Sequence, residues 1–112
     1  MKYHKDIYLP EQAKNLQFAC VVEYTPHARR EANSDRYGTI RLPAVFDSRN
    51  AELIDVTIDE NTIRRALYRM PYDDDKDLCL VIDPNTRKGI TVWLNEKNDT
   101  HASLDASRYA TA

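Results

Sequence analysis

The stretch that decides the fold is LCLVIDPNTRKGITVWLN, residues 78–95. Its first seven residues and its last six are dense in β-branched, aromatic and other apolar residues. The five residues between them form a polar segment that Gly89 closes. Two such runs separated by a turn are typical of neighbouring antiparallel strands.

The second of these strands has two different faces. Because successive side chains of a strand point to opposite sides, the apolar residues Ile90, Val92 and Leu94 share one face. The opposite face carries Thr91, Trp93 and Asn95. This second set is open to two interpretations: ordinary strand residues with aromatic and β-branched propensity, or one wall of a binding site.

Two further strands precede this pair. Residues 51–58, AELIDVTI, alternate in hydrophobicity and predict a strand. Residues 63–72, IRRALYRMPY, predict a strand that runs back, with Arg65 and Arg69 on one of its faces. The acidic run DDDKD at 73–77 is interpreted as the next turn, because it lacks the Gly and the distant Glu of a calcium-binding loop.

The N-terminal third predicts helices. Residues 10–16 favour a short helix with Pro10 at its first position. Residues 16–24 favour a strand, although their apolar spacing also permits a helix. A helix of about three turns is expected over 25–38, with Thr25 as N-cap and Gly38 as the stop. Residues 39–50 are expected to be irregular.

These elements predict an α+β fold in which one or two N-terminal helices pack on a four-stranded antiparallel meander. The 112 residues suffice for one domain, 1–112, with one core. We expect the helices to cover one face of the sheet and to leave the other face open.

Charge and cysteine content limit the function classes. The formal net charge is only −2, so no overall field draws the chain to nucleic acid or anionic lipid, and any anion site must be local. Cys20 and Cys79 each lie in an apolar run, and we interpret both as reduced core residues. No stretch is apolar enough to span a membrane or to act as a secretion signal, so a cytoplasmic protein is expected.

His27 is the first candidate site residue. It lies at the second position of the expected helix, where the helix dipole favours a neutral imidazole that can act as a base. Arg30 lies three residues further on the same face and is a natural ligand for a phosphate. The alternative is that His27 is a surface histidine without a function.

His101 is the second candidate base. Asp99 and Asp105 flank it, and either carboxylate could orient its ring, whereas the alternative is a solvated loop histidine. A metal site is not expected, because the region lacks a second His and a further ligand pair. Walker, dinucleotide and nucleophile-elbow motifs are absent, so no cofactor is expected. His4 is given no role.

The sequence YTPHARREA at 24–32, followed by strands that end in ITVWLN, resembles small bacterial and phage proteins of the barnase, EndoU, colicin and RelE group of ribonuclease-like folds. The resemblance spans roughly residues 17–109. It is closest to an uncharacterised family in which a helix begins with T-x-H-A and the last strand ends in T-V-[WY]. Thr25, His27, Ala28 and Arg30 carry the helix pattern, and Thr91, Val92 and Trp93 carry the strand pattern.

The resemblance implies a metal-independent endoribonuclease or an RNA-binding protein, related to toxins or encoded by a phage. Two sets of residues follow. The catalytic candidates are His27, Arg30, Arg69, Thr91 and His101. The substrate-binding candidates are Arg65, Trp93 and Asn95. The alternative hypothesis is a non-catalytic inhibitor on the same fold, such as a phage-encoded protein that blocks a host or defence complex, so RNA and a protein both stand as partner classes.

Overall fold

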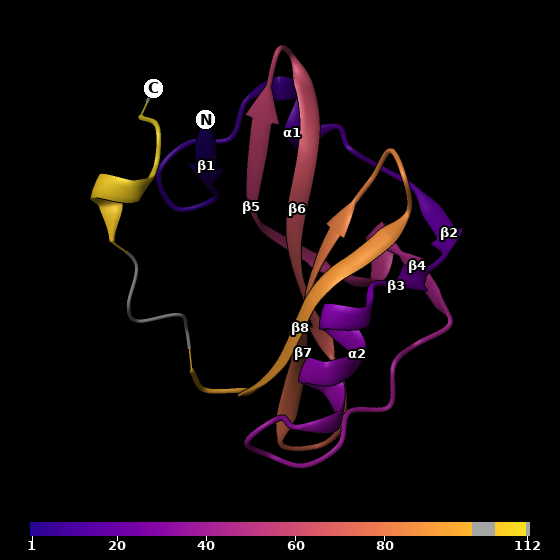
Figure 1. The fold of residues 1–112 in the computed structure, drawn as a ribbon. Coiled ribbons are helices and arrows are strands. Elements are labelled where there is room, and N and C mark those ends of the chain that lie inside the picture. Colours follow the sequence, from indigo (N-terminus) through magenta and orange to yellow (C-terminus); the bar gives the residue numbers. More distant parts are fainter. Residues whose placement is uncertain (100–104, 112) are drawn as a thin grey trace.

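The computed structural model describes residues 1–99 and 105–111. Its main feature is a strongly twisted six-stranded sheet (Figure 1). In spatial order the strands are β1 (Lys2–His4), β5 (Glu52–Asp59), β6 (Thr62–Pro71), β7 (Lys76–Asp83), β8 (Lys88–Glu96) and β3 (Glu23–Tyr24). Neighbouring strands are antiparallel except for β8 and β3, which are parallel.

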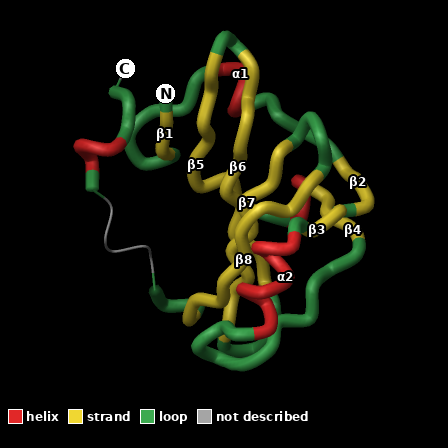
Figure 2. The backbone as a smooth tube through the Cα atoms, viewed as in Figure 1, coloured by secondary structure: helices red, strands yellow, loops and turns green. Residues whose placement is uncertain are grey.

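The remaining elements are short. A separate antiparallel ribbon consists of β2 (Ala19–Val21) and β4 (Val45–Asp47). The α-helices are α1 (Glu11–Lys14) and α2 (Pro26–Asn33), and the 3-10 turns are η1 (Ser48–Asn50) and η2 (Ala106–Arg108). Figure 2 shows how little of the backbone is helical.

The predicted fold class is therefore wrong. The chain forms a mostly β structure with a six-stranded mixed sheet and a two-stranded sheet, not N-terminal helices on a four-stranded meander. The four expected strands are present as β5 to β8. The error lies in β1 and β3, which add an edge on each side, and in the small share of helix. Strands of two or three residues carry too little periodicity to be recognised in a sequence.

The turns of the main sheet follow local residue chemistry. Asp59 pairs with Thr62, so Glu60 and Asn61 alone form the loop between β5 and β6. Both have positive φ, 51° and 63°, as a two-residue hairpin turn of the favoured type requires. Asn adopts this conformation readily, whereas Glu does so at a cost.

One face of the sheet carries the larger core. Val56, Ala66, Leu80 and Ile82 are each completely buried there, and so is Tyr68 at 2% exposure. The ribbon and the two helices supply the opposing layer: Phe46 of β4 lies 4.8 Å from the Tyr68 ring, centre to centre. Burying these side chains contributes about 1.5–3 kcal/mol for each large one.

The other face is not open as expected. A second apolar cluster of Ile54, Leu67 and Cys79 lies on it, with Val81 and Trp93 packed alongside. The chain after β8 then folds back over this face, because the Arg69 side chain binds the backbone carbonyls of Glu96 and Asp99. The C-terminal segment 105–111 lies beside β1 (Figure 1), where the Ala110 N–H donates to the Lys2 carbonyl at 2.7 Å.

Helix α2 is shorter than predicted. Thr25 is its N-cap, since the Ala28 N–H donates to Thr25 Oγ1 at 3.1 Å, but the helix ends at Asn33 and not near Gly38. Ser34 binds the Arg30 carbonyl through its hydroxyl, and Asp35 accepts from the Tyr37 N–H. These short polar side chains compete for backbone groups and terminate the helix early.

Two further expectations need correction. The strand predicted over 16–24 is divided: its first half, β2, pairs with β4, and its second half, β3, pairs with β8. Residues 39–50 are not wholly irregular, because they contain β4 and η1. The expected short helix at 10–16 is present as α1. No helix among the described residues is long and apolar enough to cross a bilayer.

Candidate functional site

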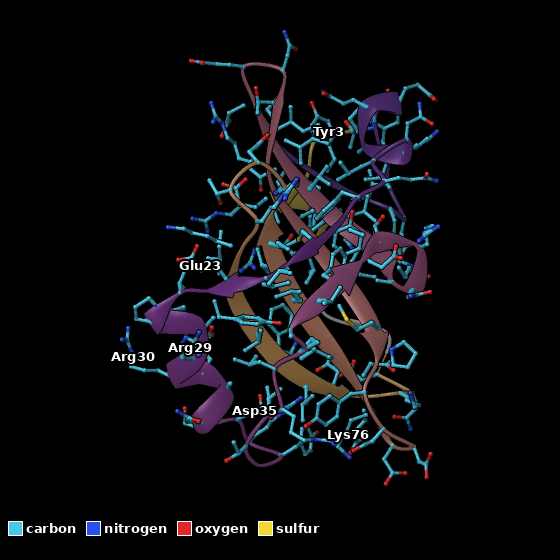
Figure 3. The ribbon with its side chains drawn as sticks, turned by 90° about the vertical axis from the view of Figure 1, so that its right-hand side faces the viewer. Tyr3, Glu23, Arg29, Arg30, Asp35 and Lys76 are labelled. Carbon is cyan, nitrogen blue, oxygen red and sulfur yellow. The ribbon has the colours of Figure 1, made fainter. Side chains whose placement is uncertain are left out.

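Helix α2 places His27 and Arg30 on its solvent side. Both residues are exposed, and His27 Nε2 lies 3.3 Å from Glu31 Oε1, one turn further along. Figure 3 shows Arg29 and Arg30 projecting outward from α2, away from the sheet. His27 therefore has a carboxylate within reach, but it stands on an open surface and not in a cleft.

The carboxylates of this helix have a structural role. Glu31 Oε1 accepts from the Val92 N–H at 3.3 Å, and Asp35 Oδ1 accepts from the Leu94 N–H at 3.2 Å. These amides lie on the edge of β8 beyond its short pairing with β3. The two side chains thus cap an otherwise unpaired strand edge, and His27 lies next to one of these caps.

Arg69 is held inside a buried polar network. Its guanidinium donates to Asp77 Oδ2 at 2.8 Å, to the Glu96 carbonyl at 2.8 Å and to the Asp99 carbonyl. Only 10% of the Arg69 side chain is exposed. Lys97 Nζ lies 2.8 Å from the second carboxylate oxygen of Asp77. Burial alone raises the pKa of Asp77, but the hydrogen bonds from Lys97 and Arg69 outweigh it and hold the pKa below its usual value.

A mixed-charge pocket of about 390 Å³ adjoins this network. Lys5, Asp6 and Glu52 form one side of it, and Arg69, Asp77, Lys97 and Asp99 form the other. Lys5 is itself paired with Glu52 at 3.4 Å. The two signs nearly balance here, so the pocket has no strong preference for a phosphate.

The remaining predicted residues share the face of Arg69. Cross-strand pairing aligns Arg69 with Cys79 and Cys79 with Trp93, so Trp93 points to the side of Arg69. By alternation Arg65 shares that side on β6, and Thr91 shares it on β8. Trp93 packs against the second apolar cluster.

Asn95 is only 5% exposed on that face. Its side-chain oxygen accepts from Arg36 Nη2 at 3.3 Å, and its amide nitrogen lies 3.8 Å from Cys79 Sγ.

The structure therefore brings together only part of the predicted set. Arg65 and Arg69 share a face of β6, and Thr91, Trp93 and Asn95 share a face of β8, as alternation within each strand predicted; strand pairing places both sets on one side of the sheet. Among the residues that the structure describes, His27 and Arg30 make no hydrogen bond or ion pair with any of them. His101 lies outside the described residues, and its role stays a prediction.

Sequence reasoning missed a polar cluster around His4. The His4 ring is 3% exposed, its Nδ1 accepts from the Asp6 N–H at 3.0 Å, and it meets the Tyr109 ring edge-on at 5.0 Å. The Tyr109 hydroxyl donates to the buried Asp55 at 3.1 Å. His4, Asp55 and Tyr109 are each more than fifty positions from one another, so no local pattern in the sequence signals that they meet.

An exposed apolar pair on the ribbon was also missed. Val21 and Val45 face each other across β2 and β4, and are 73% and 62% exposed. Arg87 directly precedes β8, and its carbonyl accepts from the N–H of Glu23, two residues beyond β2, at 3.1 Å. Its positive charge partly offsets the rise in the pKa of the buried Cys20. Burial, and then the neighbouring Cys20, raise the pKa of Tyr24 to about 12, and the positive charge of Arg29 on α2 opposes this rise. We call Val21, Val45, Arg29 and Arg87 the ribbon surface.

Within residues 1–99 and 105–111, no group of three or more His, Cys, Asp and Glu side chains is arranged to hold a metal ion. Comparisons with protein-family models, with curated proteins and with solved structures found no match to this chain.

Proposed function

We propose that this chain is a non-catalytic binding protein that docks on an acidic surface of a protein partner through the ribbon surface. Exposed apolar side chains beside cations are typical of protein interfaces, in which an apolar centre has a polar rim. The two valines form the apolar centre, at 73% and 62% exposure. Arg29 and Arg87, both exposed, supply the positive charge that selects an acidic partner.

The outer edge of the ribbon offers backbone groups as well. The Val22 N–H donates to the Ala44 carbonyl at 2.9 Å, and alternate residues of an antiparallel pair bond across it. The N–H and C=O groups of Ala19 and Val21 therefore point away from β4. An extended segment of the partner can pair with this edge, which is a common mode of peptide recognition.

The hydrogen bonds of Arg69 are the observation that favours binding over catalysis. A guanidinium that stabilises a phosphorane needs free donors aimed at the reacting phosphate. Arg69 uses its donors on Asp77 and on two backbone carbonyls, and a phosphate would have to displace a carboxylate that is only 17% exposed. These contacts therefore support a structural role of Arg69 over a catalytic role.

RNA binding without cleavage is the second candidate. The observation that favours it is that His27, Arg29 and Arg30 are all exposed on α2. The near-neutral net charge weighs against it, because RNA-binding proteins usually present a basic stripe.

The proposal includes a cytoplasmic setting, which the two free, buried thiols of Cys20 and Cys79 support. An inhibitor encoded by a phage is one form that such a binding protein can take.

Catalysis is tested by incubating the purified protein with total RNA, single-stranded RNA and ribosomes in excess chelator. We expect no cleavage by the wild type. Metal-independent cleavage that His27→Ala reduces by about 10²–10⁴-fold would contradict the proposal and support the ribonuclease hypothesis.

Binding is tested by capture from a lysate of the cells that contain this protein. We expect one stoichiometric acidic protein on the wild type and on the control Arg64→Glu, an exposed position on β6. We expect its loss on Val21→Asp and on Arg87→Glu, after their folding has been verified by circular dichroism. Equal capture by all four proteins, or capture of RNA alone, would exclude the ribbon surface as a protein-docking site.

A further inference from the structure

A pocket of about 320 Å³ lies between α1 and the core face of the sheet. Its lining comes from four separate parts of the chain and combines the apolar residues Leu9, Ala13, Leu16, Ala51 and Leu53 with the polar residues Lys14, Gln17, Ser48, Arg49 and Tyr68. In Figure 2 the short helix α1 is seen near the β5–β6 end of the sheet. We call this space the α1 pocket. A concave, mostly apolar site with a few polar groups is the usual form of a small-molecule site.

The Tyr68 hydroxyl provides the first polar group. Tyr68 lines the α1 pocket and is 2% exposed, yet its hydroxyl has no hydrogen-bond partner among the described residues. Phe18 and Phe46 fix its ring, at 6.1 and 4.8 Å between ring centres. Buried hydroxyls are nearly always hydrogen-bonded, so this donor is unusual and needs an acceptor.

Ser48 provides a second donor in the same pocket. It is 9% exposed, and its Oγ accepts from the Phe18 N–H at 3.0 Å. In the described part of the chain its hydroxyl proton has no acceptor. A carbonyl oxygen has two lone pairs and can accept from two hydroxyl groups at once.

Each of the two cations that line the pocket has an acidic partner. Lys14 is paired with Glu11 at 3.6 Å, and Arg49 forms a two-point pair with Asp47, the shorter contact being 2.7 Å. Lys14, Glu11 and Arg49 are more than half exposed, and Asp47 is 22% exposed. The cations are thus already neutralised, and the pocket does not select a charged ligand.

We propose that the α1 pocket binds a small neutral molecule with an apolar body and a carbonyl oxygen, which accepts hydrogen bonds from Tyr68 and Ser48. This site is separate from the ribbon surface and does not depend on the proposed docking function. The simplest alternative is a bound water molecule. A water satisfies the two donors but leaves the apolar lining unfilled.

The test is an amide-resolved NMR titration with two probes of similar size, cyclohexanone and cyclohexene. We expect cyclohexanone to shift the amides of Ala13, Ala51 and Leu53. We expect Tyr68→Phe to weaken cyclohexanone binding about 3- to 10-fold while it leaves cyclohexene binding unchanged, because only the ketone accepts a hydrogen bond. Tyr37→Phe, an exposed tyrosine elsewhere, serves as the matched control and should bind as the wild type does.

Tyr68→Phe removes a buried donor that has no partner, so it should raise the unfolding temperature of the free protein. A second variant, Ala51→Leu, fills the pocket and should abolish the shifts from both probes without unfolding the chain. The proposal is overturned by an absence of pocket shifts at saturating cyclohexanone, which a water-filled site would give. Equal ketone affinity of the wild type and Tyr68→Phe, or unchanged binding by Ala51→Leu, would also overturn it.

Discussion

At the scale of single residues, Arg69 shows how a residue type that suggests catalysis can instead serve structure. An arginine on a strand face is equally suited to a phosphate or to a carboxylate, because its planar fork matches both. Here Asp77 and the carbonyls of Glu96 and Asp99 surround it. The arginine connects β6, β7 and the segment after β8, so its replacement should lower the free energy of unfolding.

We predict that Arg69→Met lowers the free energy of unfolding by about 3 kcal/mol, because it leaves the buried Asp77 carboxylate with one cation fewer. The matched control, Arg64→Met, concerns an exposed arginine of the same strand and should change stability by less than about 0.5 kcal/mol. Urea denaturation followed by circular dichroism measures both. A neutral effect of Arg69→Met would show that the network does not stabilise the fold.

The same network sets an expected response to acid. Because the folded-state pKa of Asp77 lies below its ordinary value, the carboxylate stabilises the fold above that ordinary value near pH 4. This stabilisation is lost as the pH falls through the folded-state pKa. The loss of stability between pH 4 and more acidic conditions should therefore be smaller in Arg69→Met than in the wild type, when measured by urea titrations at each pH.

At the scale of elements, α2 protects the edge of β8. An exposed strand edge invites pairing with another chain, and proteins usually cover such edges. Glu31 and Asp35 do so by accepting from the amides of Val92 and Leu94. The buried Ala28 and Ala32 permit the close approach of the helix that this contact needs.

We predict that Glu31→Ala combined with Asp35→Ala speeds hydrogen exchange of the Val92 and Leu94 amides and costs about 1–2 kcal/mol of stability. The control is Asn33→Ala, an exposed substitution on the same helix. Hydrogen exchange followed by NMR resolves the two amides. Unchanged protection in the double variant would mean that the side-chain caps contribute nothing to this edge.

The four long strands were predictable because each contains enough alternating residues for its period to be read. Helix α2 was predictable at its start, where Thr25 and Pro26 are strong local signals, but not at its end. Just beyond the end of α2, Asp35 accepts a hydrogen bond from the Leu94 N–H. No local sequence rule predicts this contact.

At the scale of the whole molecule, the two ends of the described chain meet on one edge. Segment 105–111 packs on β1: Ala110 bonds to Lys2, Tyr109 bonds to Asp55, and the Tyr109 ring covers His4. Burial and the neighbouring Asp55 carboxylate raise the pKa of Tyr109 to about 12. This segment therefore shields both an edge strand and a buried polar pair from water.

We predict that truncation after residue 104 lowers the free energy of unfolding by about 2 kcal/mol, because it removes the Tyr109 packing and one hydrogen bond of the buried Asp55. Truncation after Ala110 keeps these contacts and should leave stability unchanged. Thermal and urea unfolding of the two shortened chains and the full chain measures the effect. Equal stability of all three would show that the segment only rests on the surface.

The sequence by itself determined the four long strands, the start of α2, which side chains share a face within each of β6 and β8, and the near-neutral charge. These are consequences of local period, turn chemistry and composition. Only the tertiary structure decided that short strands widen the sheet, that Arg69 is committed to Asp77, and that the Tyr68 hydroxyl lies buried beside a pocket. Such outcomes depend on contacts between residues distant in the chain. The hydrogen-bond partners and the burial of these side chains are determined only when the whole core assembles.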